Sequence, residues 1–188
     1  MGVHYRPGVL VVAATELELG FVRGADTLCC GVGPVEAAQA TARHLARTVP
    51  SALLHVGVAG ARQLEPPALV LGSESIYSDL VDAASAFPRV ERVEPDPALL
   101  AKARRALPDA AVVPIATSAR VGGGHGHADV EAMEGFAVLR AAQAAGVGAL
   151  ELRAVSNRYD ARREEWRLEE ALAALAEALP VVLRALDA

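Results

Sequence analysis

The sequence predicts an α/β fold: a single domain over residues 1–188, with a mixed, mostly parallel twisted sheet flanked by helices. Apolar runs of strand length alternate with segments of helical periodicity, which is typical of strands joined by crossover helices. A chain of 188 residues can bury one substantial core and is short for two. Hydrophobic residues make up 53% and charged residues 22%, a composition that favours a folded chain over a disordered one.

In the first half of the chain, apolar runs predict buried strands at 8–14 and 52–60, and the segment at 26–33 predicts a strand that ends in glycine. The segment TELELGFVR, which follows the first run, predicts a short helix or turn. Pro34 suits the first turn of a helix that ends near Arg47, because the N–H that proline lacks would have no helical partner there.

The second half continues the alternation of strands and helices. Asp96 and Pro97 supply an N-cap and a first-turn proline for a helix through Arg105. Apolar residues at spacings of three and four predict a long last helix, at about 166–186. The other predicted elements are a strand at 68–80 with a bend near Gly72, a strand at 110–116, a loop at 117–129, a helix at 131–145 and a strand at 148–155.

Composition and charge exclude several classes of protein. The net charge is −5 without any block of Lys or Arg, and aromatic residues make up 4%, so we expect no nucleic-acid partner. The apolar run at 8–14 is too short to span a membrane and no cleavage site follows it, so we expect a cytoplasmic protein without a membrane partner. Cys29 and Cys30 are adjacent in an apolar run, which indicates two core thiols in a reducing compartment.

Several polar residues lie where predicted strands end or helices begin. Glu16 and Glu18 follow the first strand, Glu134 lies near a helix start, and Asn157 follows the strand at 148–155. Ligands of parallel α/β sheets gather at the carboxyl ends of the strands, so this pattern predicts a small-molecule site. Each residue also has a structural interpretation. Glu16 and Glu18 can be solvated surface carboxylates, Glu134 can serve the helix dipole, and Asn157 can be a turn residue. His125 and His127 alone do not make a metal site, and we expect no metal or other cofactor.

Two motifs carry a resemblance to a known family. MEG at 133–135 and RAVSN at 153–157 resemble segments of the purine nucleoside phosphorylase and nucleosidase superfamily. Within it, NRYDARREEW at 157–166 looks most like the futalosine hydrolases, enzymes of an alternative bacterial route to menaquinone. The resemblance covers nearly the whole chain. The segments between Glu18 and Gly31 and between Thr117 and Glu131 are shorter than is usual in the superfamily.

The resemblance implies roles for the two conspicuous carboxylates. Glu18, in ATELEL, corresponds to an active-site glutamate and would be the base that activates water, with Glu16 the less favoured candidate. Glu134 would accept hydrogen bonds from the ribose hydroxyls, and Met133 would line the sugar. Charge-assisted contacts of this kind can strengthen as the ribosyl ring gains oxocarbenium character.

The resemblance also implies how the purine base is held. Nucleosidases for 6-aminopurines have aspartate where this chain has Asn157, which follows Ser156. An amide can donate to one atom of a 6-oxopurine and accept from another. Gly60, in the turn GVAG, would lie beside the sugar and base, although close backbone packing explains these glycines equally well. The glycines of GVG at 31–33 can cradle an anion or serve tight packing.

The predicted activity is therefore hydrolysis of the N-glycosidic bond of futalosine, with release of hypoxanthine and without a cofactor. The alternatives are another purine nucleosidase or phosphorylase, of the methylthioadenosine/S-adenosylhomocysteine or inosine type, and a trimmed nucleoside-binding module with weak catalysis. The expected partners are a purine nucleoside and further copies of this chain in a homo-oligomer. Arg120, Arg158 or Arg162 can meet the carboxylate of a futalosine-like tail, and the sequence does not select among them.

Overall fold

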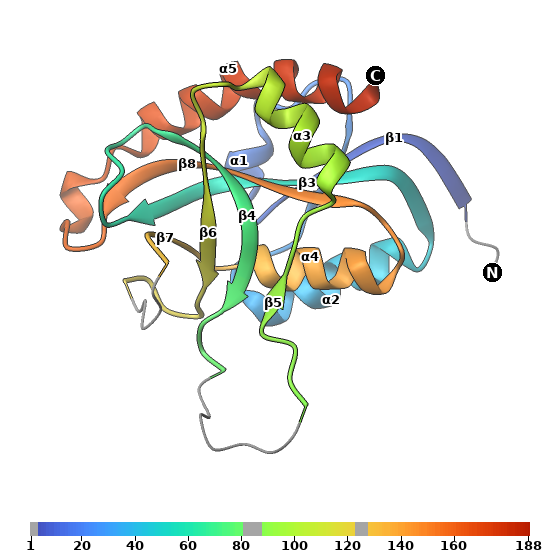
Figure 1. Ribbon diagram of the computed structural model, residues 1–188, viewed down its shortest axis with the longest axis horizontal. Coiled ribbons are helices and arrows are strands. Elements are labelled where there is room, and N and C mark those ends of the chain that lie inside the picture. Colours follow the sequence, from blue (N-terminus) through green and yellow to red (C-terminus); the bar gives the residue numbers. More distant parts are fainter. Residues whose placement is uncertain (1–3, 81–87, 123–127) are drawn as a thin grey trace.

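The computed structural model describes residues 4–80, 88–122 and 128–188, and in it one mixed sheet lies between two layers of helices (Figure 1). Helices α2 (Pro34–Leu45) and α4 (Gly135–Ala144) cover one face, and α3 (Pro97–Ala106) and α5 (Leu168–Asp187) cover the other. The strands are β1 (His4–Ala13), β2 (Asp26–Cys29), β3 (Thr48–Ala61), β4 (Leu69–Tyr77), β5 (Arg92–Val93), β6 (Ala111–Thr117), β7 (Val130–Ala132) and β8 (Ala149–Arg158). A short helix, α1 (Glu16–Leu19), follows β1, and a 3₁₀ turn, η1 (Arg163–Glu165), precedes α5. The predicted α/β class, with a mostly parallel sheet flanked by helices, is confirmed.

The strand order explains how distant segments meet. β3 lies between β1 and β8, both parallel to it, and β2 lies at the edge beyond β1. On the other side β8 pairs antiparallel with β4, and β4 pairs parallel with β6. The short strand β7 joins β6 back to β3, so the sheet closes into a ring of β3, β8, β4, β6 and β7. The sequence analysis did not predict this ring, because β7 is only three residues long.

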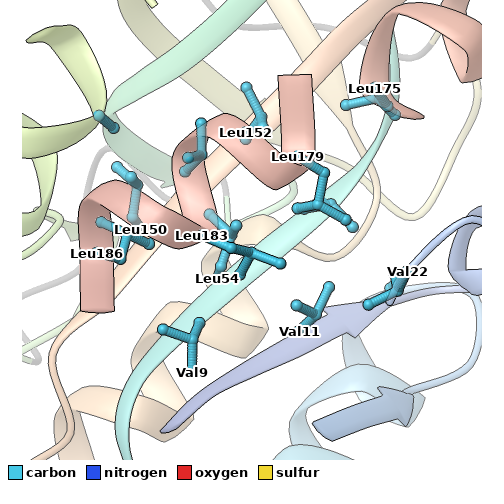
Figure 2. Close-up of a cluster of buried hydrophobic side chains, with 14 of the residues drawn as sticks. Val9, Val11, Val22, Leu54, Leu150, Leu152, Leu175, Leu179, Leu183 and Leu186 are labelled. Carbon is cyan, nitrogen blue, oxygen red and sulfur yellow. The ribbon is translucent and has the colours of Figure 1, made fainter. Parts of the chain in front are cut away.

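The hydrophobic core has a layer on each face of the sheet, and β1 contributes to both. Val9 and Val11 belong to the cluster beneath α5, whereas Leu10 and Val12 belong to the cluster with α2 and α4. This double burial explains why the buried part of β1, residues 9–13, is a continuous apolar run. Figure 2 shows the α5 side of the core, where the following leucines of α5 lie over β1, β3 and β8: Leu175, Leu179, Leu183 and Leu186. Full burial of one such side chain contributes about 1.5–3 kcal/mol, so the packing holds these three strands firmly in place.

The predicted helix at 131–145 is wrong at its start. Residues 130–132 form β7, in which Glu131 pairs with Gly60 of β3 and with Ala116 of β6. Helix α4 begins only at Gly135, and Glu134 is its N-cap. The acidic residues of this segment resemble a helix start in sequence, but pairing with two strands distant in the chain extends the backbone instead.

Several other boundaries differ from the prediction, and two of these differences concern residues 156–166. β8 does not stop at residue 155 but continues to Arg158, because β3 continues beside it and pairs Gly60 with Asn157 and Ala61 with Arg158. The last helix begins at Leu168 rather than at Trp166, because η1 occupies the segment just before it. Residues 156–158 therefore belong to the sheet, and residues 163–165 form a 3₁₀ turn that follows it.

Of the two cysteines predicted to be core thiols, one is buried and one is not. Cys30 is buried, and burial raises the pKa of its thiol to about 12. Cys29 is exposed, because β2 is the edge strand and its residues are largely uncovered, so its assignment to the core is wrong. Both thiols are free. Among the described residues, no helix is both long enough and apolar enough to cross a membrane.

Candidate active site

A cavity of about 570 Å³ opens at the carboxyl ends of β1, β3 and β8. All six site residues predicted from the sequence line it: Glu18, Gly60, Met133, Glu134, Ser156 and Asn157. They meet because the strands that precede them end at the same edge of the sheet, as expected for a ligand site in an α/β fold. One small molecule can therefore contact all of them, while the role of each side chain in binding and catalysis stays a prediction.

Glu18 is held by the turn that follows β1. Its Oε2 accepts hydrogen bonds from the backbone N–H of Thr15 at 3.1 Å and from the Thr15 hydroxyl at 2.8 Å, and the Thr15 side chain caps α1 in return. Its Oε1 accepts from the backbone N–H of Val58 in β3 at 3.2 Å. Glu18 is 7% exposed and lines the cavity, whereas Glu16 is exposed and is not among the lining residues. The capping contacts thus fix one carboxylate, that of Glu18, at the site.

Glu134 does not use its side chain to cap α4, although it occupies the N-cap position. Its Oε1 instead accepts a hydrogen bond from the backbone N–H of Gly33 at 3.0 Å, and its Oε2 lies 3.8 Å from Nη2 of Arg153. Burial raises the pKa of Glu134, and the lowering effects of Arg153 and the Gly33 N–H only partly oppose this. In the turn at 31–33, the N–H of Gly33 is therefore occupied by a carboxyl group of the protein itself.

Beneath the cavity, a chain of buried polar groups supports Glu134. Arg153 of β8 donates from Nε to Oε1 of Glu151, in the same strand, at 2.8 Å. Oε2 of Glu151 accepts from the Ser75 hydroxyl at 2.5 Å. Burial lowers the pKa of Arg153, but the carboxylates of Glu151 and Glu134 outweigh burial, so the pKa is raised overall and the guanidinium keeps its charge.

His55 completes this chain in its neutral form. Burial, and then the charge of Arg153, hold the pKa of His55 well below its ordinary value. Its Nδ1–H donates to the carbonyl of Val12 at 3.0 Å, and its Nε2 accepts from Nη2 of Arg153. Arg153 is thus bonded to groups from β3 and β8, and the cluster holds the guanidinium in one position behind Glu134.

Two glycines make room for this cluster. A Cβ atom on Gly57 of β3 would lie 2.2 Å from Nη1 of Arg153 and 2.7 Å from Oε1 of Glu18. A Cβ atom on Gly135, the glycine of MEG, would lie 2.3 Å from both carboxylate oxygens of Glu151. No side chain fits at either position, so close approach explains why these glycines belong to the GVAG and MEG motifs.

A β-bulge orients Asn157. Ala59 pairs with Val155 and Gly60 with Asn157, which leaves Ser156 as an extra residue in β8. The Ser156 hydroxyl contacts the carbonyl of Ala59 at 3.3 Å and donates to Oδ1 of Asn157 at 2.9 Å, and Nδ2 of Asn157 donates to the carbonyl of Arg158 at 2.9 Å. Bulges next to ligand sites commonly redirect a side chain, and this one holds the Asn157 amide at the cavity wall.

The segment after Asn157 also lines the cavity, through Tyr159, Arg163 and Trp166, which the sequence analysis did not single out as site residues. The Tyr159 ring lies against Gly60, and the guanidinium of Arg163 lies 4.5 Å from the centre of the Trp166 ring. The sequence signal that could have identified them is their position just after the predicted strand at 148–155. In contrast, Arg120, Arg158 and Arg162 are not among the described residues that line the cavity.

The described residues give no sign of a metal site at this cavity. Among the described residues, no group of three or more His, Cys, Asp or Glu side chains is arranged to hold a metal ion. His125 and His127 lie outside the described residues.

Comparison with known proteins relates this chain to nucleoside-cleaving enzymes. Residues 27–188 match the model of the phosphorylase superfamily. A futalosine hydrolase of Streptomyces coelicolor is 35% identical over 181 residues, which cover 83% of this chain and 77% of that enzyme. The family match, residues 27–188, includes all the described residues that line the cavity except Ala14, Thr15, Leu17 and Glu18.

Solved structures share the fold. A futalosine hydrolase mutant of Helicobacter pylori has a TM-score of 0.80 at 18% identity, with 97% of this chain and 99% of that one covered. A mutant of the Helicobacter pylori nucleosidase MTAN, with 5′-methylthioadenosine in the active site, gives 0.82 at 19% identity, with coverage of 98% and 99%. The Streptococcus pneumoniae MTA/SAH nucleosidase in complex with 8-aminoadenine gives 0.78 at 22% identity, with coverage of 95% and 99%.

Proposed function

The chain belongs to the phosphorylase superfamily, and from that premise we propose that it hydrolyses the N-glycosidic bond of futalosine and releases hypoxanthine. The observation that carries the proposal is that two buried carboxylates, Glu18 and Glu134, and the amide of Asn157 line one cavity of nucleoside size. Cleavage of such a bond needs a base for water, a holder for the ribose and a polar group for the departing base.

In this mechanism Glu18 orients and deprotonates the attacking water. Its carboxylate is fixed by the contacts with Thr15 and Val58, so little reorganisation is needed when the water is bound. Glu134 accepts hydrogen bonds from the ribose hydroxyls, with Met133 beside the sugar. The positive charge of Arg153 behind Glu134 keeps this carboxylate in place as the ribosyl ring gains positive charge.

Water rather than phosphate is the proposed nucleophile. The N–H of Gly33, which could otherwise contact an external anion, donates to Glu134. That carboxylate places a negative charge where the glycine turn faces the cavity, and a phosphate beside it would be repelled. This contact supports hydrolysis over phosphorolysis.

The arrangement of Asn157 supports a 6-oxopurine as the leaving base. Within the protein, Oδ1 of Asn157 accepts one hydrogen bond from the Ser156 hydroxyl, and Nδ2 donates one to the carbonyl of Arg158. One N–H and one acceptor position of the amide remain for a ligand. A hypoxanthine base can use both, whereas an adenine base presents an amino group in place of the carbonyl.

One incubation tests the proposal. Purified protein is given futalosine, inosine or 5′-methylthioadenosine, with and without phosphate, and base release is measured. We expect hypoxanthine release from futalosine at the same rate with and without phosphate, and far slower cleavage of methylthioadenosine. Phosphate-dependent release would favour a phosphorylase, and a preference for methylthioadenosine would refute the futalosine assignment. Tight nucleoside binding without turnover would favour the trimmed binding module.

The proposal extends to a cytoplasmic homo-oligomer that acts in menaquinone biosynthesis without a cofactor. Exposed apolar residues near the cavity support self-association: Leu17 is 62% exposed, Val32 is 56% exposed and Val35 is 75% exposed. The first two also line the cavity, so a second copy that covers them would narrow its opening. Light scattering after size-exclusion chromatography measures the assembly, and a monomer at all concentrations would contradict this part of the proposal.

A further inference from the structure

We propose that Arg163 and Trp166 form a subsite for an anionic substituent on the 5′ side of the nucleoside, in which Arg163 pairs with a carboxylate of the substrate. This inference rests on the proposed function and deepens it, because it assigns the recognition of the futalosine tail to a residue outside the three arginines that the sequence suggested. The cavity, the ring contact of Arg163 and the pairing of the neighbouring arginines carry it.

The position of the Arg163 guanidinium over the Trp166 ring suits recognition of a carboxylate. Arg163 begins η1, its guanidinium carbon lies 4.5 Å from the centre of the Trp166 ring, and both side chains line the cavity. A guanidinium that stacks on an aromatic face keeps its N–H donors in the plane of the group, where a carboxylate can bind two of them at once. The ring contact also limits the positions of an otherwise flexible side chain, so less entropy is lost on binding.

The neighbouring arginines are already paired. Arg158 contacts Glu65 at 2.8 Å, Arg162 contacts Glu165 at 3.1 Å, and Arg167 forms an ion pair with Glu170. Within the part of the chain that the structure describes, Arg163 has an aromatic partner and no carboxylate within ion-pair distance. Its charge is therefore available to a ligand.

The distribution of charge around the cavity gives the subsite its place. Glu18, Glu131 and Glu134 all line the cavity and are at most 7% exposed, so a carboxylate of the substrate would be repelled from their side. Among the described lining residues, Arg163 is the one Lys or Arg. Leu168 and Leu172, which follow it, add apolar surface for the chain that links a carboxylate to the ribose. A nucleoside with its ribose at Glu134 would thus direct an anionic tail toward Arg163.

The test compares two substrates with the same base. Futalosine carries a tail carboxylate, and inosine does not. In the Arg163→Gln variant, we expect the ratio of kcat/KM for futalosine to that for inosine to fall by about 10- to 100-fold, the usual effect of losing a hydrogen-bonded ion pair. Arg162→Gln is the matched control, since Arg162 is adjacent, 80% exposed in its side chain and paired with Glu165, and it should leave the ratio unchanged.

Binding is measured separately from turnover, in the Glu18→Gln background. Calorimetric titration should show that Arg163→Gln weakens binding of futalosine but not of inosine. An equal loss for both nucleosides, or the same drop in the ratio for Arg162→Gln, would overturn the subsite. If the wild type does not cleave futalosine, the proposed function fails. The anion subsite would still be supported if futalosine binding were weakened by Arg163→Gln and not by Arg162→Gln.

Discussion

Replacing Gly57 with alanine tests whether the buried cluster positions the carboxylates for which we propose roles in catalysis. The new Cβ atom would lie 2.2 Å from Nη1 of Arg153 and 2.7 Å from Oε1 of Glu18. An ordinary contact needs about 3.4 Å, so the guanidinium and the carboxylate must each recede, the first by roughly 1 Å. Neither has free space behind it, because Arg153 is bonded to Glu151 and His55 and Glu18 is bonded to Thr15.

The structure allows both effects of Gly57→Ala to be estimated. Overpacking of a well-packed interior reduces the free energy of unfolding by about 1–3 kcal/mol. For a chain of this size, each kcal/mol lowers Tm by about 2–4 °C, so we expect a fall of roughly 2–12 °C. A displacement of about 1 Å at a reacting group can lower the rate by about 10²-fold, so kcat/KM for futalosine should fall at least that far. Thermal unfolding and steady-state kinetics measure the two effects on one preparation.

Gly20→Ala is the control for the general effect of an added methyl group. Gly20 has φ of −58° and ends α1, and its Cβ atom would meet only the Leu17 carbonyl, at 3.4 Å, and the Glu16 carbonyl, at 3.6 Å. It should keep the wild-type kcat/KM and Tm within experimental error. The reasoning is refuted if Gly57→Ala retains full activity, because Glu18 and Arg153 would then tolerate a displacement that the mechanism forbids.

Three further substitutions separate the roles of the site residues. Glu134→Gln should lower kcat/KM by about 10²–10³-fold. Burial raises the pKa of Glu134 in the folded protein above its ordinary value of 4.5, so this group favours the folded state at low pH and loses that contribution as the pH rises through the raised pKa. The Glu134→Gln variant should therefore unfold at an equal or higher Tm than the wild type at pH 7, with no such difference below pH 4.5. A large loss of Tm in the variant at pH 7 would contradict this. Glu18→Gln should abolish turnover yet still bind nucleoside in calorimetry, and normal turnover would move the base to another residue. In the wild type, we expect kcat/KM for hypoxanthine nucleosides to exceed that for adenine nucleosides by roughly 10⁴-fold or more, and Asn157→Asp should reduce this ratio. An unchanged ratio would exclude Asn157 from base recognition.

Local pattern predicted most of the elements, and long-range pairing decided where several of them end. The runs that became the buried parts of β1 and β3 are largely apolar, because side chains on both faces of each strand belong to the core, and such runs can be recognised without knowledge of their partners. β7 and the last residues of β8 gave no such signal. Their extended backbone depends on β3, which lies far away in the sequence and pairs with both.

For the site, the sequence indicated which residues converge but not the forces that hold them there. Thr15 and Glu18 form a capping box at the spacing by which such boxes are recognised, so the fixed position of Glu18 was accessible from the sequence. The support of Glu134 was not accessible, because it depends on Gly33 and Arg153, which come from a distant turn and strand. The same holds for Arg163: four arginines lie between residues 158 and 167, and only the folded chain shows that three of them have carboxylate partners while the fourth lies on Trp166 at the cavity. A sequence pattern therefore identifies the chemistry of a site more readily than its specificity, because specificity depends on which charges remain unpaired after folding.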